Sequence, residues 1–413
     1  MLVPGVEVVI APESSLRIVA FIGLGVALGT ISGLTPGLHA NNFALLLAAA
    51  APSVPGPPML VGAAMLAAGV VHTFLDIVPA IALGVPDAAM AASALPGHRL
   101  VIEGRGHEAL RLSAMGSGLA VLLAMPLAVP VTELMVRLYP MLRPHLTVFL
   151  GLLAAFLIMT EGSHRGRLGG LVAFVGSAGL GLLTLDRDPA ALLDAGGMLA
   201  PLFAGLFGAP VLLDAMRGAG IPAQGDAVIA SQRRSIAVTA LLGTVAGAMV
   251  GYLPAVSSAI AAVVVLTVLP SGSGARQFIV ATSGVNTANM VFALFALIAL
   301  GTPRTGVLVA LDSAGVPLNL PLLLATVVIA AGAGFVLVPI VGDRYLSFIR
   351  GVNYTQLSLA ILTGLVGIAF VFAGPIGVLA FAASAVLGLL PPRLGAKRVH
   401  LMGVLMGPIM LYR

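Results

Sequence analysis

The chain alternates long apolar runs with short polar breaks, and most of its charged residues fall in the breaks. A helix needs about 20 predominantly apolar residues to cross the hydrocarbon core of a bilayer. Runs near this length cover residues 15–33, 59–83, 110–136, 145–160, 168–185, 191–216, 235–251, 277–300, 319–342, 354–374, 375–391 and 398–411. Peptide groups inside hydrocarbon have no water to bond, so each run is expected to be helical. The pattern predicts an all-α polytopic membrane protein with about 12 transmembrane helices.

Two shorter apolar segments, 37–52 and 255–269, each follow a proline directly. The first overlaps "GLTPGLHANN", residues 33–42, and the second overlaps "GYLPAVSS", residues 251–258. Proline lacks an N–H and disfavours helical backbone in the residue before it, and neighbouring glycines permit unusual backbone. We therefore expect two helices that are broken at Pro and Gly or re-entrant, in addition to the long spans.

The two halves of the sequence repeat one another. Gly25, Gly29, Gly33 and Pro36 recur 218 positions later as Gly243, Gly247, Gly251 and Pro254, and Leu83, Gly84 and Pro86 recur 217 positions later as Leu300, Gly301 and Pro303. A repeat on this scale indicates two copies of one structural unit. The expected division is a first transmembrane repeat at 1–218, a linker at 219–234 and a second repeat at 235–413.

The relative orientation of the repeats depends on how often each crosses the membrane. With six crossings each, the 20 Lys and Arg residues divide eleven to nine between the two sides. With seven crossings each, they divide fourteen to six. The positive-inside rule prefers the second arrangement, in which the repeats are inverted and both termini face outside. Parallel repeats remain the alternative.

Composition fixes the broad class. Apolar residues make up 59% of the chain, and only 20 basic and 15 acidic residues occur among 413, which excludes a soluble globular protein. The basic residues lie in short groups beside apolar runs rather than in one patch, so the lipid bilayer, and not nucleic acid, is the expected partner. There are no cysteines, which excludes disulfides and thiolate chemistry. We expect a multi-pass protein of the cytoplasmic membrane.

The first candidate site is the pair of helix breaks. A helix that starts inside the membrane offers free N–H groups and a partial positive charge, which suit an anion. Paired breaks at matching positions of two repeats indicate a midplane substrate site in secondary transporters. The candidate residues are Gly33, Thr35, Pro36, Gly37, His39, Asn41 and Asn42 in the first copy and Gly251, Pro254, Ser257 and Ser258 in the second. The alternative is that Gly and Pro only kink two packed helices.

The second candidate site lies in "VVHTFLDIVPAIALGVPD", residues 70–87, aligned with residues 284–304. Asp76 is the candidate for binding a coupling proton or sodium ion, and His72 is an alternative protonation site, because ionisable residues at span depth usually serve an ion path. A structural His–Asp hydrogen bond is the competing interpretation. Thr73, Asn286, Thr287 and Asn289 are further substrate ligands, although a threonine can bond its own helix instead.

Other chemistry is not indicated. The polar stretch 95–111 contains His and Glu, but its three arginines would repel a metal ion, so a charged loop is expected. Asp312 is expected in a solvated loop. No Walker A motif, G-x-S-x-G elbow or HExxH pair occurs, so the chain is not expected to be an enzyme or to bind ATP, and no cofactor beyond a coupling ion is predicted.

Three motifs, "GLTPGLHANN", "HTFLDIVPAIALGVPD" and "LPGHRLVIEGRGHEA", together with "LFAGLFGAP" at 202–210, resemble the TctA family, the large membrane subunit of tripartite tricarboxylate transporters. The histidine after "PGL" is similar to the archaeal branch, since bacterial members usually have glycine there. The resemblance implies a carboxylate transporter driven by a proton or sodium gradient. It also implies two partners, a small membrane subunit and an extracytoplasmic binding protein. The departure at His39 puts a tricarboxylate substrate in doubt.

Three hypotheses follow. The first is a gradient-driven permease for an anionic, carboxylate-bearing substrate, in which opposed helix N-termini hold the anion and one repeat moves against the other. The second is a flippase for a polyprenyl phosphate or another anionic lipid. The third is an intramembrane enzyme or assembly scaffold, for which His72 and Asp76 would be the catalytic pair. A homo-oligomer is compatible with each.

Overall fold

The computed structural model describes residues 12–411 except 37, 39, 85–93, 188, 190, 193–196, 217–220 and 270–273. Every regular element in this part is helical. The helices are α1 (Pro12–Leu34), α2 (Ala40–Ala50), α3 (Pro58–Leu75), α4 (Ile77–Leu83), α5 (Ala94–Ile102), α6 (Gly106–Leu142), α7 (Leu146–Met159), α8 (His164–Thr184), α9 (Leu199–Phe203), α10 (Ala209–Ala215), α11 (Arg233–Tyr252), α12 (Ser258–Val268), α13 (Ala275–Leu300), α14 (Gly306–Ser313), α15 (Leu320–Arg350), α16 (Tyr354–Gly388), α17 (Leu390–Arg393) and α18 (Gly403–Leu411). A π-helical turn at Ala204–Gly208 joins α9 to α10, and a 3₁₀ turn at Arg398–Met402 precedes α18.

The all-α membrane architecture predicted from the sequence is confirmed. Eight helical stretches in the described part are long and apolar enough to cross a membrane, and three further apolar helices are shorter. The predicted runs 110–136 and 145–160 lie in one continuous helical stretch, Gly106–Met159. The runs 354–374 and 375–391 also share one stretch, where Gly374 has a φ of 58° just before Pro375 and kinks α16.

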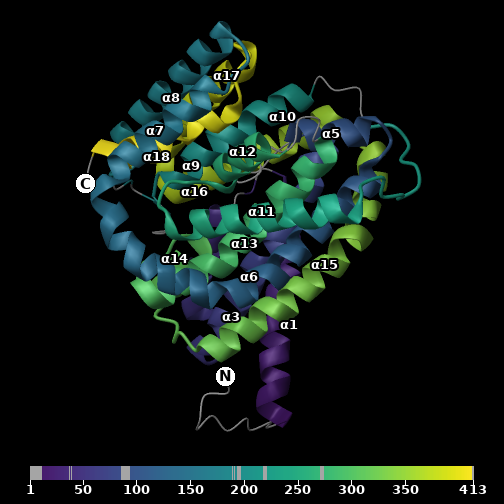
Figure 1. The fold of residues 1–413 in the computed structure, drawn as a ribbon, viewed down its shortest axis with the longest axis vertical. Coiled ribbons are helices and arrows are strands. Elements are labelled where there is room, and N and C mark those ends of the chain that lie inside the picture. Colours follow the sequence, from purple (N-terminus) through teal and green to yellow (C-terminus); the bar gives the residue numbers. More distant parts are fainter. Residues whose placement is uncertain are drawn as a thin grey trace.

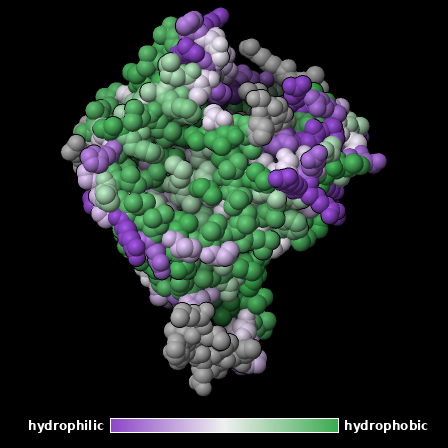
Figure 2. Space-filling view, in the orientation of Figure 1, coloured by the Kyte–Doolittle hydropathy of each residue, from purple (hydrophilic) through white to green (hydrophobic). Residues whose placement is uncertain are grey.

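The outer surface is apolar over a broad belt. Figure 2 shows hydrophobic atoms across the middle of the molecule and hydrophilic atoms gathered at its top and right edge. Large apolar side chains are exposed on the molecule, including Leu122, Leu152 and Leu379, which are 71%, 67% and 70% exposed. Exposed apolar side chains of this kind suit a lipid environment, because contact with lipid avoids the unfavourable free energy of exposing apolar surface to water.

By their contacts the helices form two packed groups, and α11, α13 and α16 contribute side chains to both hydrophobic cores. The first group contains α1, α3, α6, α11, α13 and α15, and the second contains α7, α8, α9, α16 and α18. In Figure 1, α7, α8 and α18 lie together at the upper left, and α1, α3 and α15 lie at the lower right. Each group combines helices from both halves of the chain, so the groups do not coincide with the two predicted repeats.

Glycine stripes on α1 and α11 allow close helix contacts. A Cβ at Gly33 would meet Leu75 Cβ of α3 at 2.8 Å, and a Cβ at Gly251 would meet Phe292 Cβ of α13 at 2.8 Å. Leu75 and Phe292 are 217 positions apart in the sequence. The partners of the preceding glycines, Val71 for Gly29 and Ala288 for Gly247, have the same separation. This packing aligns His72 with Asn289 and Thr73 with Met290, so Thr73 and Thr287 are not equivalent in the packing.

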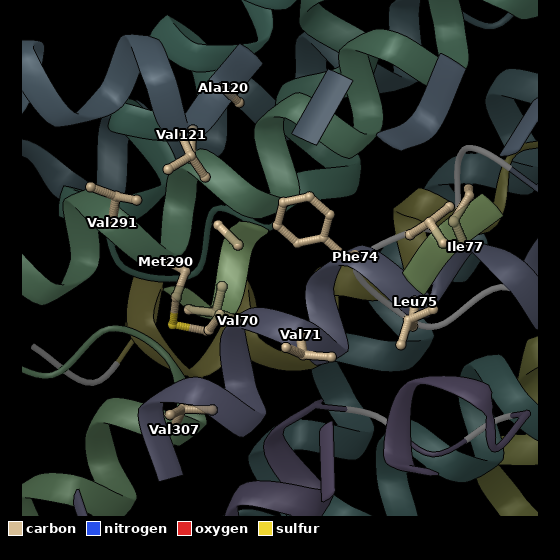
Figure 3. Close-up of a cluster of buried hydrophobic side chains, with 14 of the residues drawn as sticks. Val70, Val71, Phe74, Leu75, Ile77, Ala120, Val121, Met290, Val291 and Val307 are labelled. Atoms are coloured by element: carbon tan, nitrogen blue, oxygen red, sulfur yellow. The ribbon is translucent and has the colours of Figure 1, made fainter. Parts of the chain in front are cut away.

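The core between α3, α6 and α13 is filled by interleaved apolar side chains. Figure 3 shows Phe74 of α3 between side chains of neighbouring helices, with Val121 of α6 and Met290 of α13 nearby. All three are buried. This tight packing fixes the positions of the polar residues that alternate with them on α3 and α13.

A turn at Asp76 separates α3 from α4. Proline at position 79 has no N–H for the carbonyl of residue 75, and its ring clashes with that carbonyl, so the helix cannot pass through regularly. Asp76 still donates its own N–H to the carbonyl of His72 at 2.9 Å. The chain therefore bends where its buried carboxylate lies.

Candidate functional site

A cavity of about 140 Å³ lies between the two packed groups. Its polar lining is Thr73, Ser257, Ser258, Asn286, Asn289, Arg304 and Thr305, and its other lining residues are Ala40, Phe203, Val250, Leu253, Pro254, Ala255, Val256, Met290, Met402 and Leu405. Thr73, Val250 and Asn286 come from helices of the first group. Phe203 of α9 and Leu405 of α18 come from the second. Both predicted helix breaks reach this cavity, because Ala40 begins α2 and 254–258 leads into α12.

The second break has an unusual backbone. Leu253 is extended, as a residue before proline prefers to be, and Ala255 has a φ of 61°, the only positive φ of a non-glycine residue in the described part. Such a conformation costs about 1–3 kcal/mol and persists only where its surroundings fix it. Ser257 then caps α12 by accepting a hydrogen bond from the N–H of Ile260 at 3.3 Å. Irregular backbone of this kind at membrane depth is tolerated beside a cavity.

The first break is described only in part. Gly37 and His39 lie outside the described residues, and so do the side chains of Asn41 and Asn42. Thr35 is exposed and donates its hydroxyl to the carbonyl of Ile31 at 2.7 Å, which is the local bonding that competes with a ligand role. Gly33, Pro36 and Gly251 do not line the cavity; Gly33 and Gly251 serve the helix contacts described above.

A chain of hydrogen bonds joins the two halves at the cavity. Asn286 of α13 donates its amide to the carboxylate of Asp76 at 2.7 Å. The hydroxyl of Ser258 donates to the amide oxygen of Asn286 at 3.4 Å. Asp76, Asn286 and Ser258 are all buried, at 4%, 5% and 4% exposure. A change of charge at Asp76 can therefore reach the start of α12 through one intervening amide.

His72 lies in a different environment from Asp76. Its Nδ1 is 2.9 Å from the hydroxyl of Ser32 in α1, and its ring stacks on Phe43 of α2 with centroids 6.2 Å apart. Neither His72 nor Asp76 lines the cavity directly. The contacts with Ser32 and Phe43 make His72 a link between α1, α2 and α3.

The two threonines have local partners. Thr73 lines the cavity but donates its hydroxyl to the carbonyl of Val70 at 2.7 Å. Thr287 faces α6, where it donates to the hydroxyl of Ser117 at 2.8 Å, and Ser117 in turn donates to the carbonyl of Ser283 at 3.2 Å. Thr287 therefore belongs to a polar seam between α6 and α13 and not to the cavity.

Arg304 was not among the residues expected from the sequence. Gly301, with a φ of 61°, ends α13 in the left-handed conformation and turns the chain back. The non-helical residues 302–304 then run toward Thr305, whose hydroxyl lies 3.9 Å from the sulfur of Met290. An arginine just beyond an apolar span has the pattern of a topology-setting charge, and only the reversal of the chain places it at the cavity.

The polar stretch 95–111 forms ion pairs away from the cavity. Buried Glu108 accepts from Arg276 at 2.8 Å and from the backbone N–H of Ala230 at 2.8 Å, which ties the linker to α6 and α13. Asp312 is exposed near the end of α14. Among the described residues, no group of three His, Asp or Glu residues could hold a metal ion.

These features define a polytopic helical membrane protein with a polar cavity between two helix groups, lined by the starts of two interrupted helices. Residues 19–403 match the model of the tripartite tricarboxylate transporter TctA family, and the chain belongs to that family. It is 27% identical over 404 residues to an uncharacterized protein of Methanocaldococcus jannaschii, which covers 95% of this chain and 98% of that protein. No solved structure matches the chain. TctA is a transporter family, and the similarity to an archaeal protein agrees with the archaeal resemblance of "PGLH".

Proposed function

We propose that this protein is a secondary active permease of the cytoplasmic membrane that moves a small carboxylate-bearing anion by alternating access. The observation that carries the proposal is the single cavity reached by both interrupted helices, with Ala40 at one helix start and Ser257 at the other. Free N–H groups at helix starts favour anions, and interrupted helices in paired positions form the substrate sites of such transporters.

The two packed groups are the moving bodies in this proposal, rather than the two repeats. Helices of both groups line the cavity, so sliding or rocking of one group against the other would open it on alternate sides. Asp76 is the proposed coupling residue, which would take up a proton or sodium ion. Its link to Ser258 through Asn286 would transmit the charge state of Asp76 to the cavity wall.

Uptake by proteoliposomes tests the proposal. The purified chain is reconstituted and offered radiolabelled carboxylates, with a proton gradient, a sodium gradient or neither imposed. Uptake above that of protein-free liposomes that depends on one gradient is the expected result. Gradient-independent movement of a fluorescent polyprenyl phosphate, without carboxylate uptake, would instead favour a flippase. A small membrane subunit and an extracytoplasmic binding protein are the proposed partners, and adding them would raise uptake if they act with this chain.

A further inference from the structure

Arg304 is the only charged side chain among the described residues that line the cavity. It comes from the second half of the chain, but Tyr139 at the end of α6 in the first half holds it. Its Nη2 donates to the Tyr139 hydroxyl at 2.7 Å, and the guanidinium carbon lies 5.1 Å from the centre of the Tyr139 ring. A hydrogen bond and a cation–π contact thus orient the guanidinium without neutralising it.

Among the described residues, the guanidinium of Arg304 has no anionic neighbour. No carboxylate of the described residues forms an ion pair with Arg304, and its buried Nε has no hydrogen-bond partner among them. Two other half-buried arginines have carboxylate partners, Arg276 with Glu108 and Arg398 with Asp214. A partly buried cation without a counter-ion is unfavourable, and a bound carboxylate would supply both the charge and the acceptor.

A second polar group in the cavity also lacks a partner. The amide oxygen of Asn289, one turn from Asn286 on α13, is buried without a hydrogen bond from any described residue. The two ends of an Asn amide are assigned from their surroundings, so this group can serve a donor or an acceptor on a ligand. The cavity therefore offers one site for an anion and one site for a neutral hydrogen-bonding group.

The volume of the cavity suits a small ligand. An engineered cavity of about 150 Å³ in another protein binds benzene, which has six non-hydrogen atoms. The cavity here is of similar volume, about 140 Å³, and its remaining wall is apolar, including Phe203, Val250 and Met402. A tricarboxylate is about twice as large and would bring two further negative charges to a wall in which the described residues supply no second cation.

From these observations we infer that Arg304 binds the carboxylate of the substrate, and that the substrate is a short monocarboxylate with one further hydrogen-bonding group, such as a 2-hydroxy or 2-oxo acid. This inference rests on the proposed transport function and narrows its substrate class. Tyr139 is a positioning residue, since it acts by orienting Arg304.

Ligand-dependent thermal stabilisation of the purified wild-type protein tests the substrate class without any variant. Lactate, malate and citrate are compared at equal ionic strength, with chloride as the reference. Lactate is expected to raise the unfolding midpoint in a saturable manner, and citrate is not. Stabilisation by citrate with none by lactate would overturn the assignment of a monocarboxylate.

Variants test the residue. Arg304→Gln is expected to raise the half-saturation concentration for lactate at least about tenfold, as loss of a charge-assisted contact does. Arg304→Lys keeps the charge and should retain measurable affinity, and Tyr139→Phe should give a smaller loss. The matched control is Arg344→Gln, because Arg344 is exposed and bonds only its own helix at Ile340.

The outcomes separate this inference from the transport proposal. If wild-type protein shows no gradient-dependent uptake of any carboxylate, the transport proposal fails. If uptake is present but Arg304→Gln and Arg344→Gln behave alike, transport stands and the role of Arg304 is refuted. Monodisperse elution of each variant in detergent shows that a loss of affinity is not a loss of folding. If Arg304→Gln does not fold, the affinity of Arg304→Lys for lactate tests the role of Arg304 instead.

Discussion

The two helices that supply the polar wall, α3–α4 and α13, are packed in the same way but carry different chemistry. Each is held by a glycine-bearing helix, α1 or α11, with partners 217 positions apart. In this packing Asp76 corresponds to Ala293 and Pro79 corresponds to Ala296. The first helix is therefore bent beside a carboxylate, whereas α13 runs unbroken from Ala275 to Leu300.

The difference indicates that the two halves of the chain contribute different polar groups from helices that are packed alike. The first copy contributes an ionisable group at a bend, where backbone can shift, and the second contributes neutral amides on a rigid helix. Arg304 also belongs to the second copy, and it enters the cavity only because α13 is followed by a reversal at Gly301. Ion coupling and substrate recognition would then reside in different copies.

Removing the charge of the first copy should have the largest effect. Asp76→Asn keeps a hydrogen-bonding group beside Asn286 but cannot take up a cation, so gradient-stimulated uptake is expected to fall at least about tenfold, to the level of liposomes without a gradient. Substrate exchange in the absence of a gradient should persist. Uptake is measured in proteoliposomes with Asp312→Asn, an exposed carboxylate, as the control. Unchanged gradient dependence would remove Asp76 from the coupling mechanism.

Transferring the bend to the second copy tests whether the difference in backbone matters. Ala296→Pro should remove one hydrogen bond of buried α13 and destabilise the protein by about 3 kcal/mol or more. A lower unfolding midpoint in detergent measures this loss. The reciprocal change, Pro79→Ala, should leave the protein folded but reduce uptake by straightening α3–α4. Full uptake by Pro79→Ala would show that the bend at Asp76 has no role in transport.

Substitutions at the glycine contacts test whether α1 packs on α3 in the same way as α11 packs on α13. A Cβ at Gly247 would lie 2.7 Å from Ala288 Cβ, and a Cβ at Gly29 would lie 2.9 Å from Val71 Cβ. Gly247→Ala and Gly29→Ala should each destabilise by about 1–3 kcal/mol, since overpacking displaces a helix. Gly367→Ala, with nothing within 4 Å of the new methyl group, is the control. A cost at only one of the two glycines would contradict equivalent packing.

The smallest effect is expected at the end of the hydrogen-bond chain. Ser258→Ala removes a long bond of 3.4 Å to Asn286, worth about 0.5–1 kcal/mol, so the half-saturation concentration for substrate should rise about twofold to fivefold. Concentration-dependent uptake measures it. Ser313→Ala is matched to it, because Ser313 bonds only carbonyls of its own helix. A loss as large as that of Asp76→Asn would mean that Ser258 binds substrate or ion directly.

Most of the helices could be predicted from hydropathy, because a lipid-embedded chain must satisfy its peptide groups within each segment. The breaks at Pro36 and Pro254 were predicted for the same kind of local reason, since proline cannot donate a backbone hydrogen bond. Ser257, Ser258, Asn286 and Asn289 were found by looking for polar groups in apolar surroundings, and the structure places all four at the cavity. Thr35 and Thr287 were chosen by the same criterion, but nearby groups satisfy their hydroxyls.

The sequence by itself determined the class of protein, the places where helices break and the presence of a buried carboxylate at Asp76. These follow from local chemistry: the hydrophobicity of each segment, the missing N–H of proline and the cost of a charge in an apolar run. Only the tertiary structure decided that the hydrophobic cores combine helices from both halves of the chain and that Arg304 lies at the cavity. The same holds for the match of α3–α4 with α13, in which Asp76 and Ala293 occupy equivalent positions. These depend on contacts between residues far apart in the chain, whose pairing no local pattern records.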